Sequence, residues 1–120
     1  MKRYIPVSLL LFLFAVAFAA DELIPYAILN ESELGSTKLS LDIEVPLIEE
    51  RLPTAEELGA VSQHLLKQSS KHDRTFVSFY LPGMEVGAGA YATAHHDPEM
   101  EVKIQKFMLF AYPEYEEYAE

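Results

Sequence analysis

The chain has 120 residues, 9 basic against 19 acidic side chains, and no cysteine. This length holds one small domain, and the net charge of −10 disfavours nucleic acid and anionic membranes as partners, because both attract clustered Lys and Arg. The lack of cysteine excludes disulfides, thiolate metal ligands and thiol nucleophiles. An acidic field attracts cations, so a basic protein is one partner that we expect, and a small ligand is the other.

Residues 1–19 have the three parts of a secretory signal peptide. They comprise a charged start at Lys2 and Arg3, an apolar run over residues 7–18 and small residues around Ala19. The apolar run is shorter than the roughly 20 residues of a membrane-spanning helix, and two acidic residues follow it. We therefore predict an exported protein, periplasmic or extracellular, that keeps no membrane anchor after cleavage.

The next part of the chain predicts two strands and a helix. Residues 24–29 are mostly apolar and suit a first strand, and residues 39–45 alternate apolar with polar side chains, which is typical of a strand with one buried face. Thr54 and Glu57 have the spacing of a capping box, in which each residue bonds the backbone of the other. Apolar residues then repeat at helical spacing, so we predict a helix from Thr54 to about Ser70.

Three more strands are predicted in the second half, over residues 75–81, 90–96 and 100–105. The order strand, strand, helix, strand, strand, strand indicates an α+β domain over residues 20–105, with one helix packed on a mostly antiparallel sheet. Residues 106–120 form an acidic aromatic tail. Because chain ends are often poorly ordered, we expect this tail to be loosely held.

The fourth predicted strand alternates alanine with Tyr91, Thr93 and His95. Small residues suit the face beneath a helix, so we expect these three side chains on the opposite face, with Ser78 and Tyr80 of the neighbouring strand beside them. Tyrosine supplies contact area and a hydroxyl, which favours a recognition surface. The alternative is that these rings pack against the tail as a second, smaller core.

Glycines precede this strand at Gly83, Gly87 and Gly89. A phosphate-binding dinucleotide loop leads into a helix, whereas a strand follows here. We therefore interpret these glycines as residues that allow positive φ or a bulge in a hairpin spanning residues 80–98. The predicted binding residues are Tyr80, Gly83, Gly89, Tyr91, Thr93 and His95.

His95, His96 and Asp97 contain the imidazole and carboxylate groups of metal sites and general bases. Neighbouring strand residues point to opposite faces, so the two imidazoles do not meet at one ion without a bend. We predict no metal site, no catalytic residue and no cofactor. The alternative function is a small hydrolase or metal-dependent enzyme centred on His95, with Thr93, Asp97 or Tyr80.

The sequence resembles an uncharacterised family of small bacterial domains. The similarity lies in a YLPGM segment at 80–84, a GAGAYATAH segment at 87–95 and an EVKI segment at 101–104. It covers most of the domain and is densest over residues 75–104, although the family typically has Trp where Tyr91 stands. The resemblance implies no activity, cofactor or substrate, and its matching site positions are Gly83, Gly89, Thr93 and His95.

Together these features favour an exported binding module that uses the 80–98 hairpin and an aromatic sheet face. A plainer possibility is a structural domain whose tail mediates self-association. An enzyme is disfavoured, because no G-x-S-x-G segment or cofactor motif occurs in so short a chain.

Overall fold

The computed structural model describes residues 23–69, 72–96 and 99–118. The predicted signal peptide at residues 1–19 lies outside the described residues. In the part that the structure describes, no helix is both long enough and apolar enough to cross a membrane.

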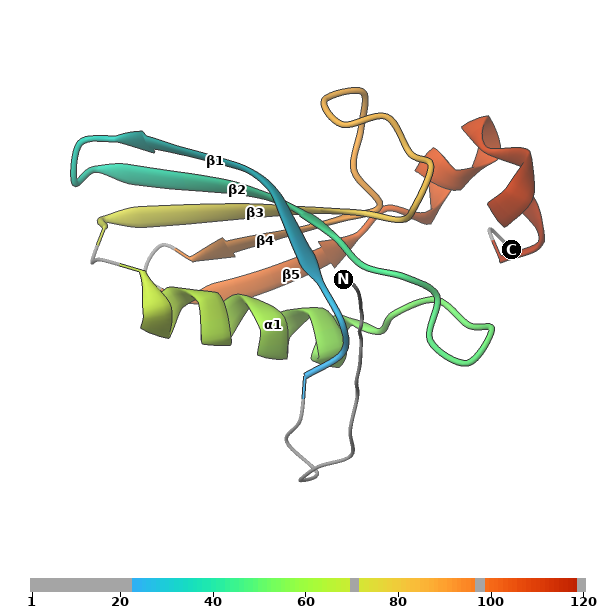
Figure 1. The fold of residues 1–120 in the computed structure, drawn as a ribbon, viewed down its shortest axis with the longest axis horizontal. Coiled ribbons are helices and arrows are strands. Elements are labelled where there is room, and N and C mark those ends of the chain that lie inside the picture. Colours follow the sequence, from blue (N-terminus) through green and yellow to red (C-terminus); the bar gives the residue numbers. More distant parts are fainter. Residues whose placement is uncertain (1–22, 70–71, 97–98, 119–120) are drawn as a thin grey trace, which may run out of the picture.

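The predicted α+β fold is confirmed, with five strands in one sheet and one α-helix on one of its faces (Figure 1). Strand β1 pairs with β2, and β3, β4 and β5 follow in that order across the sheet. All pairs are antiparallel except β2 and β3, which are parallel because the helix connects them. The elements are β1 (Ala27–Leu34), β2 (Lys38–Glu44), α1 (Ala55–Gln68), β3 (Arg74–Tyr80), β4 (Ala92–His96), β5 (Met100–Ile104) and the 3₁₀ helices η1 (Lys106–Ala111) and η2 (Pro113–Tyr118).

Helix α1 begins at the predicted capping box. The Glu57 N–H donates to the Thr54 hydroxyl at 3.2 Å, and the Glu57 carboxylate accepts the Thr54 N–H at 2.9 Å. Arg51 also donates two hydrogen bonds to this carboxylate, at 2.9 and 2.7 Å. These bonds from Arg51, with those from Thr54, lower the pKa of Glu57 to about 2. The helix ends at Gln68, close to the predicted end.

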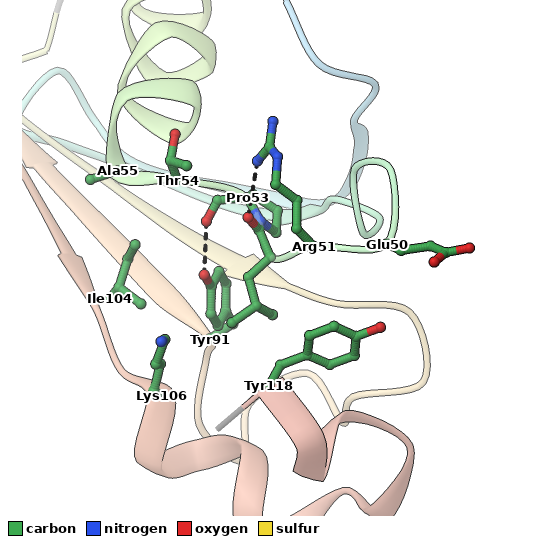
Figure 2. A pocket seen from close by; sticks show the side chains of 10 residues that line it. Glu50, Arg51, Pro53, Thr54, Ala55, Tyr91, Ile104, Lys106 and Tyr118 are labelled. Atoms are coloured by element: carbon green, nitrogen blue, oxygen red, sulfur yellow. Dashed lines mark hydrogen bonds between the residues drawn. The ribbon is translucent and has the colours of Figure 1, made fainter. Parts of the chain in front are cut away.

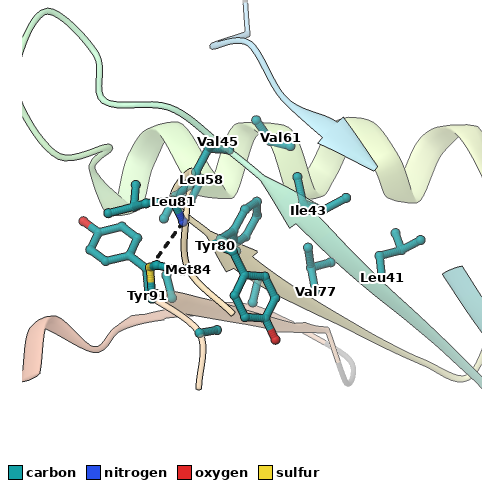
Figure 3. Packing of buried hydrophobic residues seen from close by; sticks show 14 of the residues in the cluster. Leu41, Ile43, Val45, Leu58, Val61, Val77, Tyr80, Leu81, Met84 and Tyr91 are labelled. Atoms are coloured by element: carbon teal, nitrogen blue, oxygen red, sulfur yellow. Dashed lines mark hydrogen bonds between the residues drawn. The ribbon is translucent and has the colours of Figure 1, made fainter. Parts of the chain in front are cut away.

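The core lies between α1 and the sheet (Figure 3). The alternation predicted for the second strand is confirmed, since Leu39, Leu41 and Ile43 are buried while the polar residues between them are half-buried. From the helix, Leu58 and Val61 are fully buried against this face. Each such side chain contributes about 1.5–3 kcal/mol through burial.

The first strand lies later in the chain than predicted. It spans Ala27–Leu34 instead of residues 24–29, and all eight of its residues are exposed. The apolar residues ahead of it pack partly buried against the core, and the Tyr26 ring meets the His64 ring edge-on at 6.4 Å. Strand β1 is therefore held by its backbone pairing with β2. It has no buried face, so the sequence shows no apolar alternation by which it could be predicted.

The tail is not loosely held, and that prediction is wrong. Leu109 of η1 is fully buried, and Tyr115 of η2 is 6% exposed. The Tyr115 hydroxyl donates to the Pro82 carbonyl oxygen, and the Tyr112 hydroxyl accepts the Glu85 N–H at 3.0 Å. The tail thus docks on the loop between β3 and β4, and the core continues past residue 105.

Candidate binding surface

A β-bulge at the start of β4 decides where the Tyr91 side chain points. The Tyr91 N–H donates to the Phe79 carbonyl at 2.8 Å, while Phe79 is the sheet partner of Ala92. Two residues of one strand therefore face one residue of its neighbour, which sets Tyr91 and Ala92 on the same, buried side. The expectation that Tyr91 lies on the outer face is wrong, because its ring is 1% exposed.

The Tyr91 hydroxyl instead donates a 2.8 Å hydrogen bond to the carbonyl oxygen of Pro53, just before the start of α1. Burial, helped by the negative charge of Glu57, raises the pKa of Tyr91 to about 12. Tyr91 is therefore a neutral hydrogen-bond donor that supports the helix start.

Three other predicted binding residues shape the loop after β3. Tyr80 lies on the face away from α1, but the loop covers it, and its hydroxyl accepts the Gly87 N–H at 3.1 Å (Figure 3). Gly83 and Gly89 have φ angles of +90° and +125°, as expected for glycines in this loop. A Cβ atom at Gly89 would overlap the side chain of Met108. The loop and tail belong to the same core cluster as α1 and the sheet, so the alternative of a separate, smaller core is wrong as well.

Thr93 and His95 do lie on the face away from α1. They alternate along β4 with Ala92 and Ala94, which are buried on the helix side. His95 stacks on Phe76 of β3 with ring centroids 4.3 Å apart and an angle of 16° between the rings. The Lys38 Nζ of β2 lies 5.0 Å from the centroid of the Phe76 ring, within reach of a cation–π contact. A row of stacked side chains therefore crosses three strands.

Strand register places polar residues around this row. Glu101 is the partner of His95 on β5, and Thr93 lies between Ser78 and Lys103. A hollow of about 330 Å³ is lined by Thr93, His95, Glu101, Val102 and Lys103. We define the outer-face patch as Lys38, Phe76, Ser78, Thr93, His95, Glu101 and Lys103.

A second hollow, of about 460 Å³, lies at the start of α1 (Figure 2). One of its charged groups, the Arg51 guanidinium, bonds Glu57 and the Leu52 carbonyl. Four separate parts of the chain meet here, so no local motif predicts it. Its lining is Glu50, Arg51, Leu52, Pro53, Thr54, Ala55, Tyr91, Ile104, Lys106 and Tyr118.

No group of three His, Asp or Glu side chains within the described residues could hold a metal ion. Asp97, which was a candidate partner of His95, lies outside the described residues. Of the side chains named for the enzyme alternative, Thr93 and His95 line one hollow, whereas the Tyr80 hydroxyl accepts the Gly87 N–H beneath the loop.

Sequence reasoning missed four members of the site, namely Lys38, Phe76, Glu101 and Lys103. Phe76 sits in a nearly continuous apolar run, and only the pairing of β3 with β4 brings it against His95. Phe76, Ser78 and Tyr80 occupy alternate positions along their strand and therefore point to the same face. That spacing is the signal that could have identified Phe76 as a site residue.

No protein-family model, curated protein or solved structure matches the chain, so the resemblance to a family of small bacterial domains remains a prediction.

Proposed function

We propose that this protein is an exported binding module that engages a protein partner through the outer-face patch. One observation carries the proposal: Phe76 stacks on His95 in the middle of the sheet face opposite α1, and no α-helix among the described residues covers that face. Charged and hydroxyl side chains surround this pair. An aromatic centre with a polar rim is the usual anatomy of a protein interface.

The same face is less suited to catalysis. An enzyme centred on His95 needs an acid, base or nucleophile converging with it, but the Tyr80 hydroxyl bonds Gly87 beneath the loop. The Tyr91 hydroxyl bonds Pro53 on the other side of the sheet. What remains beside His95 is the stacked Phe76 ring and a hollow that Thr93, Glu101 and Lys103 help to line, and we interpret this arrangement as a binding surface.

The charge of the chain favours a basic partner. Removal of the predicted leader takes away Lys2 and Arg3 and leaves 7 basic against 19 acidic side chains. A field of this sign attracts cationic proteins over distances of about 10 Å or less in physiological salt. The secretory features of residues 1–19 support export, and the partner would then be met outside the cytoplasm.

Site-specific photo-crosslinking tests the surface. A benzoylphenylalanine placed at Ser78, within the patch, should crosslink a partner in envelope extract, whereas one at exposed Gln63 on α1 should not. The captured partner is then purified, and its affinity is measured for wild type, His95→Ala and Phe76→Thr. Loss of a central interface residue weakens binding about tenfold or more.

Two results would refute the proposal. One is crosslinking from Gln63 without crosslinking from Ser78. The other is an affinity that neither His95→Ala nor Phe76→Thr changes, in variants whose melting temperatures show that they are folded.

A further inference from the structure

We infer that the free edge of β1 is a second binding site, which accepts an extended basic segment of another protein as an added strand. Strand β1 lies at the border of the sheet and pairs with β2 on one side (Figure 1). Among the described residues, no strand runs along its other side. The outer-face patch lies on β2 to β5, so this site does not depend on the function proposed above.

The exposure of β1 suits strand addition. All eight of its residues are exposed, and three of them are large and apolar: Ile28 at 50%, Leu29 at 39% and Leu34 at 66% exposed. The strand contains no Pro, Lys or Arg, the residues with which many proteins block an open edge, although a shift in register between Ile28 and Asn30 interrupts its regular pairing with β2. An edge of this kind presents backbone N–H and C=O groups that an extended peptide can pair with.

A hollow beside the strand defines what the added segment should carry. It measures about 190 Å³, lies between β1 and the end of α1, and is lined by Ile28, Glu31, Leu39, Leu41, Leu65, Gln68 and Ser69. Ile28 pairs with Ile43 and Glu31 with Leu41, on either side of the register shift between Ile28 and Asn30, so both β1 side chains lie on the helix side of the sheet. An added strand would place an apolar side chain at this hollow and, two residues along the same face, a cation opposite Glu31.

Charge argues against a second copy of this chain as the occupant. A symmetric antiparallel pairing of β1 centred on Glu31, Ser32 or Glu33 sets carboxylate opposite carboxylate, which is destabilising. Each copy also carries a net charge of −10. Glu33 is already 2.9 Å from the His72 ring nitrogen, so Glu31 is the carboxylate that selects the incoming cation.

Two capped peptides test the site. The first reads Thr-Val-Thr-Lys-Thr-Val-Thr-Lys, which puts valine and lysine alternately on one face, and the second has glutamate in place of lysine. Each is titrated into ¹⁵N-labelled protein expressed from the full chain, and amide shifts report both the location and the affinity. We expect shifts in Ala27–Leu34, with the lysine peptide binding about fivefold more tightly than its glutamate twin.

A charge reversal at Glu31 then tests whether this carboxylate sets the preference between the two peptides. Glu31→Lys should invert the preference, so that the glutamate peptide binds more tightly. Glu116→Lys makes the same change in charge at an exposed position of η2 and should leave the preference for lysine intact.

Three results would overturn the inference. Shifts confined to the outer-face patch would leave that patch as the binding site and remove β1 from consideration. An unchanged preference in Glu31→Lys, or no binding of the lysine peptide, would show that the edge selects nothing. A dimer in sedimentation velocity whose amide shifts map to β1 would make a second copy the occupant.

Discussion

The hydroxyl of Tyr91 and the carbonyl oxygen of Pro53 lie 2.8 Å apart, although 38 residues separate them in the sequence. Both groups are buried, so the carbonyl depends on this donor. The bond ties the beginning of β4 to the segment that caps α1. Tyr91, which the strand pattern predicts on an outer recognition face, makes this bond inside the protein.

Tyr91→Phe should lower the free energy of unfolding by about 1–2 kcal/mol, because it leaves the buried Pro53 carbonyl without its donor. Urea unfolding measures the change. Tyr112→Phe is the matched control, since the Tyr112 hydroxyl bonds the Glu85 N–H at an exposed position and should cost less. Equal losses in the two variants would contradict the role given to the buried bond.

Glu57 should make stability depend on pH in the acid range. The hydrogen bonds from Arg51 and Thr54 hold its pKa at about 2 in the folded protein, below the ordinary 4.5. Its contribution is therefore complete above about pH 4.5 and is lost as the pH falls towards 2. Glu57→Gln can still accept the Thr54 N–H, so its unfolding free energy should fall less steeply over this range. Parallel pH profiles for the two proteins would rule out this assignment.

Gly89→Ala should destabilise the protein by about 2 kcal/mol. Its φ of +125° is strained for any residue with a Cβ atom, and the added methyl group meets the Met108 side chain. Because Met108 belongs to η1, the tail should also be cut more readily in limited proteolysis. Gly35→Ala, with φ of +58° and open space around it, should have a smaller effect, and the reverse order would be inconsistent with tail docking at Gly89.

Leu109→Ala should cost about 2–5 kcal/mol, the usual range for a buried leucine. Its neighbour on the same 3₁₀ helix, Phe110, is 63% exposed, and Phe110→Ala should change the unfolding free energy by less than about 0.5 kcal/mol. Chemical denaturation of both variants decides whether the tail belongs to the core. A neutral Leu109→Ala would mean that residues 106–118 are dispensable for folding.

Local rules predicted those parts of the fold that depend only on neighbouring residues. The alternation over residues 39–45 places Leu41 inward wherever β2 lies in the sheet, because side chains alternate along any strand. The capping box is equally local, since Thr54 and Glu57 bond each other's backbone three residues apart. The α+β class and the order of the elements followed from such patterns.

Contacts between distant segments decided the rest. The bulge opposite Phe79 reverses the side on which Tyr91 lies, and no alternation rule applies across a bulge. Docking of the tail needs the loop carbonyl of Pro82 and the space above Gly89, which exist only after the sheet has formed. The Phe76 and His95 rings likewise meet only through strand register. The sequence alone thus determined α1 and the strands β2 to β5, because their patterns are local. Tertiary packing decided where β1 lies, how the tail folds and which side chains remain at the surface.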